Sequence, residues 1–252
     1  MAGERSGAGD PAKTLRLLWR EPDDTPRRGP RPGLTVDTVV DTATAIADAE
    51  GLAALTVRRV AADLGVSAMT VYTYVPGKAE LVDAMLDAAY ARMRRADTTG
   101  RPWRERLTAV ADENRTLCRT HPWVAGVHTA RPTLGPGAMA RYEHELSALD
   151  GLGLTDVQLD DAVTYLTGFV YGCARAEADA RAAATDSAMN DEQWWAANAP
   201  LLAKVFDAAT YPLAARVGSA AGAAHGAAYD PDHAYAFGLA RVLDGLATLI
   251  ER

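Results

Sequence analysis

The stretch from residue 55 to residue 81, LTVRRVAADLGVSAMTVYTYVPGKAEL, restricts the fold more than any other part of the chain. It holds two short runs in which apolar residues recur every three or four positions, which is the period of an α-helix. Thr56 and Ser67 precede the two runs as N-caps, and Gly65 supplies a tight turn between them. The stretch therefore predicts two short helices, at 56–64 and 67–74, joined by a sharp turn.

Helical periodicity continues on both sides of this stretch, and the alternating pattern of β-strands is absent. The Gly/Ala-rich stretch 218–228 is expected to be a mobile connection. The other helices are predicted at 35–50, 78–95, 102–120, 122–128, 137–150, 155–182, 191–209 and 231–251. The fold class is therefore all-α, with an N-terminal three-helix domain and a C-terminal helical bundle.

Composition divides the chain into three parts. Residues 1–33 are rich in Pro, Gly and Arg and predict a flexible basic arm, within which Leu15, Leu17, Leu18 and Trp19 form an apolar patch able to dock on the body. Residues 34–80 form the three-helix domain, and the next helix connects it, to about residue 95, with the bundle. Residues 96–252 form that bundle.

The net charge of −7 is unevenly distributed. Residues 1–96 contain 13 basic and 13 acidic residues, whereas residues 97–252 contain 13 basic and 20 acidic residues. Phosphate attraction depends on charges within about 10 Å at moderate ionic strength. An acidic C-terminal part therefore does not exclude a nucleic-acid-binding N-terminal part.

Several protein classes find little support in the sequence. Cys118 and Cys173 lie far apart without the spacing of a zinc site or a disulfide framework, so a reducing cytoplasm is expected. No signal peptide or long apolar segment is apparent. The HEL sequence at His144 lacks the second histidine of a zinc protease, and no G-x-S-x-G or phosphate loop occurs. We therefore expect no enzyme activity, no cofactor, no metal and no membrane partner.

The two short helices have the order of parts found in a helix-turn-helix, in which the second helix enters the DNA major groove. Arg58 and Lys78 fall where flanking phosphates lie. A purely structural helix pair is the alternative, but it gives little reason to expose so many hydroxyls beside a lysine. The residues expected to face the DNA are Ala68, Met69, Thr70, Thr73 and Tyr74.

The succession LTVRRVAADLGVSAMTVYTYVPGKAELVDAML closely resembles the DNA-binding domain of the TetR family of bacterial repressors. The resemblance is strong from residue 35 to about 95. It implies base or backbone contacts from Arg58, Ala68, Met69, Thr70, Thr73 and Tyr74, and phosphate contacts from Thr56, Ser67, Tyr72 and Lys78. Because Ala68 and Met69 offer only apolar contacts, direct readout depends on thymine methyls and on Arg58.

The C-terminal part resembles the tetracycline-repressor branch of the family, more faintly. The segment HPWVAGVHTARPT at 121–133 is similar to a loop of that branch, and 166–180 and 234–251 are similar to its dimerisation helices. The resemblance implies a homodimer on a palindromic operator, released by a small-molecule effector. Interior helices of a monomeric bundle remain an alternative for these segments, and a multidrug-sensing or architectural DNA binder without one fixed operator remains an alternative function.

The effector is expected to be hydrophobic or aromatic. Tetracycline is not favoured, because His128 is followed by an arginine after three residues, whereas that branch has four, and a structural role for His128 is the alternative to ligand contact. Adjacent helical residues point about 100° apart, so Trp194 and Trp195 cannot easily share one core. The residues expected to line the effector site are Trp123, His128, Arg131, Tyr142, Tyr165, Phe169, Trp194 and Trp195.

The arm has two interpretations. It is a disordered tether, or the arginines between residues 27 and 31 lie in the minor groove, as the arms of other helix-turn-helix domains do.

Overall fold

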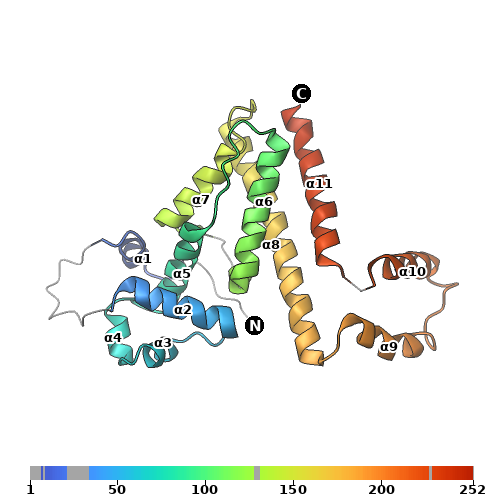
Figure 1. Ribbon diagram of the computed structural model, residues 1–252, viewed down its shortest axis with the longest axis horizontal. Coiled ribbons are helices and arrows are strands. Elements are labelled where there is room, and N and C mark those ends of the chain that lie inside the picture. The colour runs from blue at the N-terminus through green and yellow to red at the C-terminus, as the bar shows by residue number, and fades with distance from the viewer. Residues whose placement is uncertain (1–6, 8, 22–33, 128–130, 227–228, 252) are drawn as a thin grey trace.

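The computed structural model describes residues 7, 9–21, 34–127, 131–226 and 229–251, and every regular element within these ranges is helical. This confirms the all-α prediction. Figure 1 shows a small group of helices, α1 to α4, joined through α5 to a larger bundle of α6, α7, α8 and α11. The helices are α1 (Pro11–Leu18), α2 (Val36–Glu50), α3 (Val57–Asp63), α4 (Ala68–Tyr72), α5 (Lys78–Arg92), α6 (Trp103–Thr120), the 3-10 helix η1 (Pro122–Gly126), α7 (Pro136–Ser147), α8 (Asp156–Ser187), α9 (Asp191–Leu202), α10 (Pro212–His225) and α11 (Pro231–Ile250).

Side-chain caps position the first helices of the N-terminal domain. Thr35, Thr56 and Ser67 each accept a hydrogen bond from the backbone N–H three residues later, at the starts of α2, α3 and α4. Gly65 follows α3 with φ = 64°, a backbone conformation that side chains other than glycine disfavour. The predicted starts of these helices are thus confirmed.

Two hydrophobic cores hold the chain together. The first packs α2, α3, α4 and α5 against α1, η1 and the C-terminal end of α6. It therefore joins α2–α4, the half expected to read DNA and called below the DNA-reading half, to the body. The second lies between α6, α8 and α11. In the second core α8 and α11 approach closely, because a Cβ on Gly238 would overlap the ring of Phe169. The DNA-reading half is therefore fixed to the rest of the chain by buried apolar contacts.

Two segments differ from their predictions. The stretch 218–228, expected to be mobile, is helical up to His225, because Pro212 starts α10 and Gly226 ends it in a left-handed conformation, with helix-favouring alanines between them. The arm expected over 1–33 contains α1, which Asp10 caps and Pro11 starts. The other predicted helices agree within five residues, except that α9 ends at Leu202 instead of residue 209.

Helix α1 is docked on the body of the protein. Leu17 and Leu18 are 7% and 2% exposed in the first core, and the Trp19 indole N–H donates to the carbonyl oxygen of Leu134 at 2.8 Å. The Asp10 backbone N–H donates to Glu80 of α5 at 3.1 Å. Residues ahead of the helix-turn-helix thus form part of the folded core.

Truncating Leu18 to alanine is expected to lower the free energy of unfolding by about 2–4 kcal/mol, because a fully buried side chain is removed. Leu15→Ala, at a position 40% exposed, is the matched control and is expected to cost less than about 1 kcal/mol. Urea unfolding of both variants measures the difference. Equal losses would show that α1 is not docked.

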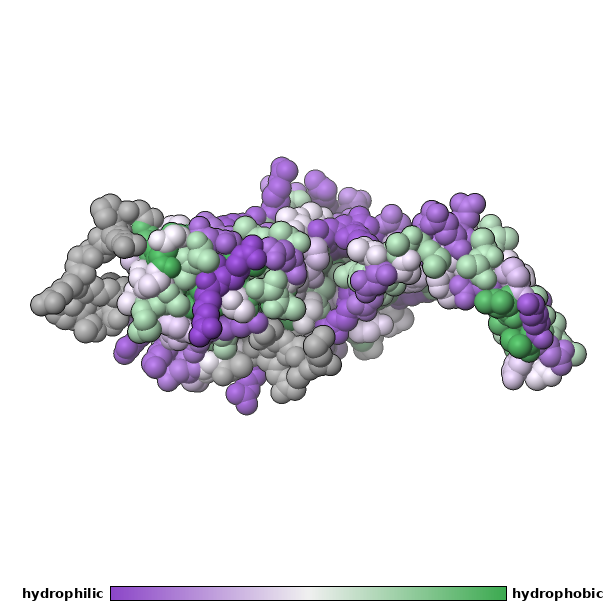
Figure 2. Space-filling model, turned by 90° about the horizontal axis from the view of Figure 1, so that it is seen from below, coloured by the Kyte–Doolittle hydropathy of each residue, from purple (hydrophilic) through white to green (hydrophobic). Residues whose placement is uncertain are grey.

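Helices α9 and α10 extend away from the bundle and form a second, C-terminal arm, separate from residues 1–33 (Figure 1). Neither helix contains a buried residue, and apolar surface gathers at this end of the molecule in Figure 2. The exposed apolar residues of the arm include Trp194, Trp195, Leu201, Val205, Tyr211 and Leu213. No helix in the described ranges is both long and apolar enough to cross a membrane.

Candidate nucleic-acid interface and adjoining cavity

Helices α3 and α4 form a tight pair. The Val66 N–H donates to the carbonyl oxygen of Ala61 at 2.9 Å across the turn after α3, and Ser67 then starts α4. Val60 and Val71 are fully buried between the two helices. Burial of one side of this pair leaves the other side of α4 open to solvent.

The outward side of the pair carries most of the residues expected to contact DNA. Met69 is 73% exposed and Tyr72 is 47% exposed. Ala68 and Tyr74 are only half-buried and pack against the first core, so they face outward less than expected. Thr56, Arg58, Ser67 and Thr73 are exposed, and Thr70 and Lys78 are half-buried.

Two neighbouring arginines on α3 have different surroundings. Arg59 is held by Glu50 at 2.8 Å and by Asp63 at 3.1 Å, and both pairs raise the pKa of its guanidinium. Arg58 is exposed and forms no ion pair with any described residue. The positive charge of Arg58 is therefore available to a phosphate or a base.

Lys78 begins α5, beside the helix pair. Its Nζ lies 3.4 Å from the carbonyl oxygen of Leu52, so the ammonium is held near the end of the loop that follows α2. This contact places a cation at the edge of the surface that carries Tyr72 and Thr73.

Carboxylates of α2 tie the DNA-reading half to the body. Asp41 forms an ion pair with Arg92 of α5 at 2.6 Å. Asp48 lies 2.8 Å from Nδ1 of His121 and accepts the Trp123 indole N–H at 2.7 Å. The spacing of seven residues places Asp41 and Asp48 on one side of α2. This side therefore connects α2 to both α5 and the end of α6.

A cavity of about 550 Å³ lies between α5 and α6. Two of its lining residues, Arg92 and His121, are the same groups that hold Asp41 and Asp48 of α2. The complete lining is Ala89, Arg92, Met93, Arg94, Ala96, Ala109, Asp112, Glu113, Thr116, Leu117, Thr120 and His121. The cavity therefore adjoins the contacts that attach the DNA-reading half.

The residues expected to contact an effector do not line this cavity, and the structure scatters them. Trp123 is buried beside Asp48, and Phe169 stacks on Tyr235. Tyr142 and Tyr165 are exposed, Arg131 is exposed near Gly7, and Trp194 and Trp195 lie on the arm. His128 lies outside the described residues. Their joint role stays a prediction, and a single chain does not bring them together.

A buried polar cluster lies between α5, α6, α7 and α8. Glu145 is 3% exposed and accepts hydrogen bonds from Arg141 and from the Asn114 amide, both at 2.8 Å. The Arg141 guanidinium lies 4.5 Å from the ring centroid of Tyr90 and 5.4 Å from that of Tyr171. Burial raises the pKa of both tyrosines, so both phenols stay protonated at neutral pH. No periodic pattern in the sequence predicts this cluster, because its members come from four helices.

Cys118 adjoins this cluster, and burial raises the pKa of its thiol to about 12. Only the thiolate is nucleophilic, so Cys118 is expected to resist iodoacetamide both at pH 7 and at pH 9. Unfolding in urea should make it react as an ordinary thiol, and peptide mass spectrometry measures the label. Complete labelling of Cys118 in the native protein would contradict the packing.

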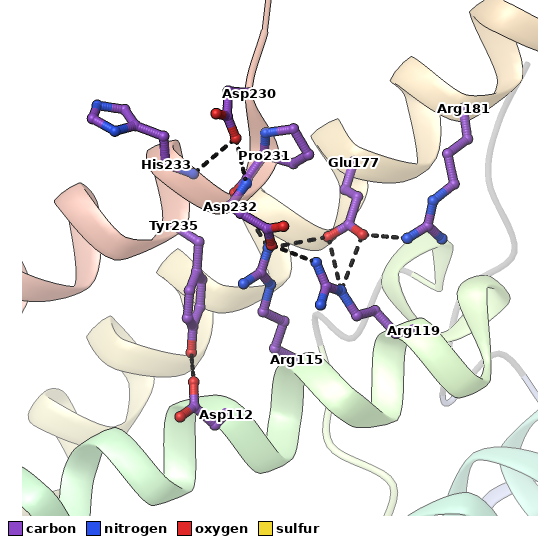
Figure 3. Close-up of polar contacts among 10 residues, drawn as sticks. All are labelled: Asp112, Arg115, Arg119, Glu177, Arg181, Asp230, Pro231, Asp232, His233 and Tyr235. Atoms are coloured by element: carbon purple, nitrogen blue, oxygen red, sulfur yellow. Dashed lines mark hydrogen bonds and ion pairs between the residues drawn. The ribbon is translucent and has the colours of Figure 1, made fainter. Parts of the chain in front are cut away.

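A second polar network joins α6, α8 and α11 (Figure 3). Glu177 of α8 is 6% exposed and accepts from Arg119 at 3.0 Å. Asp232 of α11 pairs with Arg115 at 2.6 Å and with Arg119 at 2.7 Å, and these arginines lower the pKa of Asp232. The Tyr235 hydroxyl donates to an α6 carboxylate at 2.8 Å. The network fixes the start of α11, where the chain returns from the arm.

Comparison with known proteins gives two family matches. Residues 39–85 match the model for bacterial regulatory proteins of the tetR family, and residues 96–250 match that for the tetracyclin repressor-like C-terminal domain. An HTH-type transcriptional repressor, DrrR1 of Streptomyces coeruleorubidus, is 43% identical over 98% of this chain and 89% of its own length.

Solved structures agree with these matches. ActR of Streptomyces coelicolor, in complex with actinorhodin, is 25% identical and has a TM-score of 0.72 over 86% of this chain and 98% of its own. BioQ with its double-stranded DNA operator is 26% identical and has a TM-score of 0.50 over 57% of this chain and 87% of its own. With both domains matched in order, the chain belongs to the TetR family of transcriptional regulators.

Proposed function

We propose that this protein is a ligand-responsive repressor that binds a palindromic operator in the cytoplasm as a homodimer and leaves it when a small molecule binds the body. The observation that carries the proposal is the outward surface of the α3–α4 pair. It presents Arg58, which has no ion pair with any residue of the described ranges, the exposed Tyr72 and Thr73 and the adjoining Lys78 on a rigid, well-capped scaffold. Hydroxyls and cations in this arrangement suit phosphate oxygens, and an exposed α4 suits the major groove.

The proposed dimer interface lies on the outward sides of α8 and α11. A Cβ added at Gly168 or Gly172 of α8 or at Gly245 of α11 would meet no other part of the chain within 4 Å, so a second chain has room for close approach. Tyr165 and Phe237, each 59% exposed, flank these glycines. Leucines on the opposite side of α11, such as Leu239 and Leu246, are buried within one chain. The glycines and the aromatic residues therefore support the interface.

The effector is proposed to bind in the α5–α6 cavity. Its volume falls within the range of about 300–1,000 Å³ usual for small-molecule sites. The cavity touches both α5, which leads to the DNA-reading half, and Asp112, which accepts the hydrogen bond from Tyr235 of α11. ActR, a relative solved with actinorhodin, supports binding of a small molecule by a body of this fold.

Selection from random double-stranded DNA with the purified full-length protein tests the proposal. The selected sequences are expected to share a palindrome whose half-sites lie about one helical turn, or about 34 Å, apart. Footprinting of the selected DNA should show one protected region. Diffuse protection without a symmetric motif would instead favour the architectural alternative.

A further inference from the structure

The end of the cavity nearest α2 is basic, and the identity of the effector's recognition group follows from it. Arg92 and His121 line this end while each holds a carboxylate of α2. Arg94 also lines the cavity and has no ion-pair partner among residues whose positions are described. The α2 end of the cavity therefore offers the Arg92 guanidinium and the His121 imidazole to an acid.

We propose that the effector is an organic acid, with a carboxylate or phenolate on an apolar aromatic body, and that its acid group displaces Asp41 from Arg92 while its body reaches toward His121. This inference rests on the proposed function, because it names the ligand class of the same cavity. The exchange replaces one ion pair of Arg92 by another. The released Asp41 side chain, which is 52% exposed, is left in contact with water.

The spacing of the groups supports one ligand reaching both contacts. Asp41 and Asp48 are seven residues apart, which is about 10.5 Å along α2. An aromatic acid of drug size spans a comparable length. Its body is expected to lie on the apolar part of the lining, which consists of Ala89, Met93, Ala96, Ala109 and Leu117.

The acidic part of the lining is already engaged within the chain. Asp112 accepts from Tyr235 at 2.8 Å, and Glu113 accepts from the Ala96 N–H at 2.6 Å and lies 2.7 Å from His144. Both carboxylates precede His121 by eight or nine residues, which is about 12–14 Å along α6. Asp112 and Glu113 therefore lie at the end of the cavity opposite α2. A cationic ligand bound by them would not disturb the contacts of Asp41 and Asp48.

Displacement of Asp41 removes one of the two polar contacts described between α2 and the cavity wall. The α2–α4 unit keeps its caps and its apolar packing on α5, but on the Arg92 side its angle to α5 is then set by that packing alone. Because ligand and DNA act through the same contacts, their coupling is reciprocal, so an acid that favours the released arrangement must bind less tightly to the DNA-bound protein.

Calorimetric titration of the full-length protein with three probes of one shape tests this inference. The probes are anthraquinone-2-carboxylate, anthraquinone-2-carboxamide and 2-(aminomethyl)anthraquinone. The carboxylate is expected to bind at least about tenfold more tightly than the other two, which corresponds to one charge-assisted contact. Equal binding of carboxylate and carboxamide, tighter binding of the amine or no binding of the carboxylate would each overturn the inference.

Two variants test separately the group that is proposed to bind the acid, Arg92, and the group that competes with the acid, Asp41. Arg92→Gln is expected to abolish the preference for the carboxylate, whereas Asp41→Asn, which removes the competing carboxylate, is expected to raise its affinity about three- to tenfold. Neither variant should alter binding of the carboxamide. Arg104→Gln is the control, because Arg104 also forms an exposed ion pair between helices, with Asp244 at 3.1 Å.

Unchanged carboxylate affinity in Asp41→Asn would also contradict the inference. Operator binding measured without any probe distinguishes this failure from failure of the proposed function. A protein that binds its palindrome but not the carboxylate would remain a repressor with a different effector class.

Discussion

Replacing Arg58 by alanine is expected to weaken operator binding by the dimer roughly 30- to 1,000-fold, since one contact of about 1–2 kcal/mol is lost from each of two chains. The structure supports a large effect because Arg58 is exposed and lacks an ion pair in the described part of the chain, so no internal partner competes with DNA. Fluorescence anisotropy with labelled operator DNA measures the affinity.

Salt dependence identifies which kind of contact Arg58 makes. If it binds a phosphate, the slope of log affinity against log salt falls by about two per dimer, whereas a base contact leaves the slope nearly unchanged and relaxes sequence preference. Arg101→Ala, an exposed arginine in the loop before α6, is the control. Equal affinity of the Arg58 and Arg101 variants would show that α3 does not face the DNA.

Placing an arginine at Gly168 is expected to separate the dimer and to reduce operator affinity at least about 100-fold, because each chain then binds one half-site without its partner. Gly168 has open space around it on the outward side of α8, so the substitution leaves the core of a single chain intact. Sedimentation equilibrium should give the chain mass of 26.7 kDa instead of twice that value.

Ala140→Arg supplies the matched control for this variant. It adds the same side chain at an exposed position of α7, away from α8 and α11. We expect it to stay dimeric and to bind the operator normally. A dimeric Gly168→Arg protein would place the interface elsewhere.

Local signals explain why the helix-turn-helix was predictable. Thr56, Ser67 and Gly65 act through contacts within three or four residues, so the sequence contains all the information needed to place α3 and α4. The same kind of signal marked α1, through Asp10 and Pro11, although composition favoured a disordered arm. The capping residues thus indicated the position of helix α1 better than the Pro and Gly content of the segment did.

The proposed effector site was not predictable in the same way. Arg92 and His121 are 29 positions apart in the printed sequence and meet beside α2 only after the first core has formed. The aromatic residues were selected by type, and type alone does not say which helices pack together. Trp123, for example, bonds Asp48 and is buried rather than facing the cavity. Which residues line the cavity is therefore determined by how the helices pack.

In the proposed arrangement two copies of this chain read DNA together, with their α4 helices in successive major grooves. The most direct test compares binding to the selected palindrome with binding to the same palindrome carrying five additional base pairs between its half-sites. Five base pairs rotate one half-site by about half a turn, so affinity is expected to fall at least about 100-fold. Equal affinity for the two DNAs would contradict the paired arrangement.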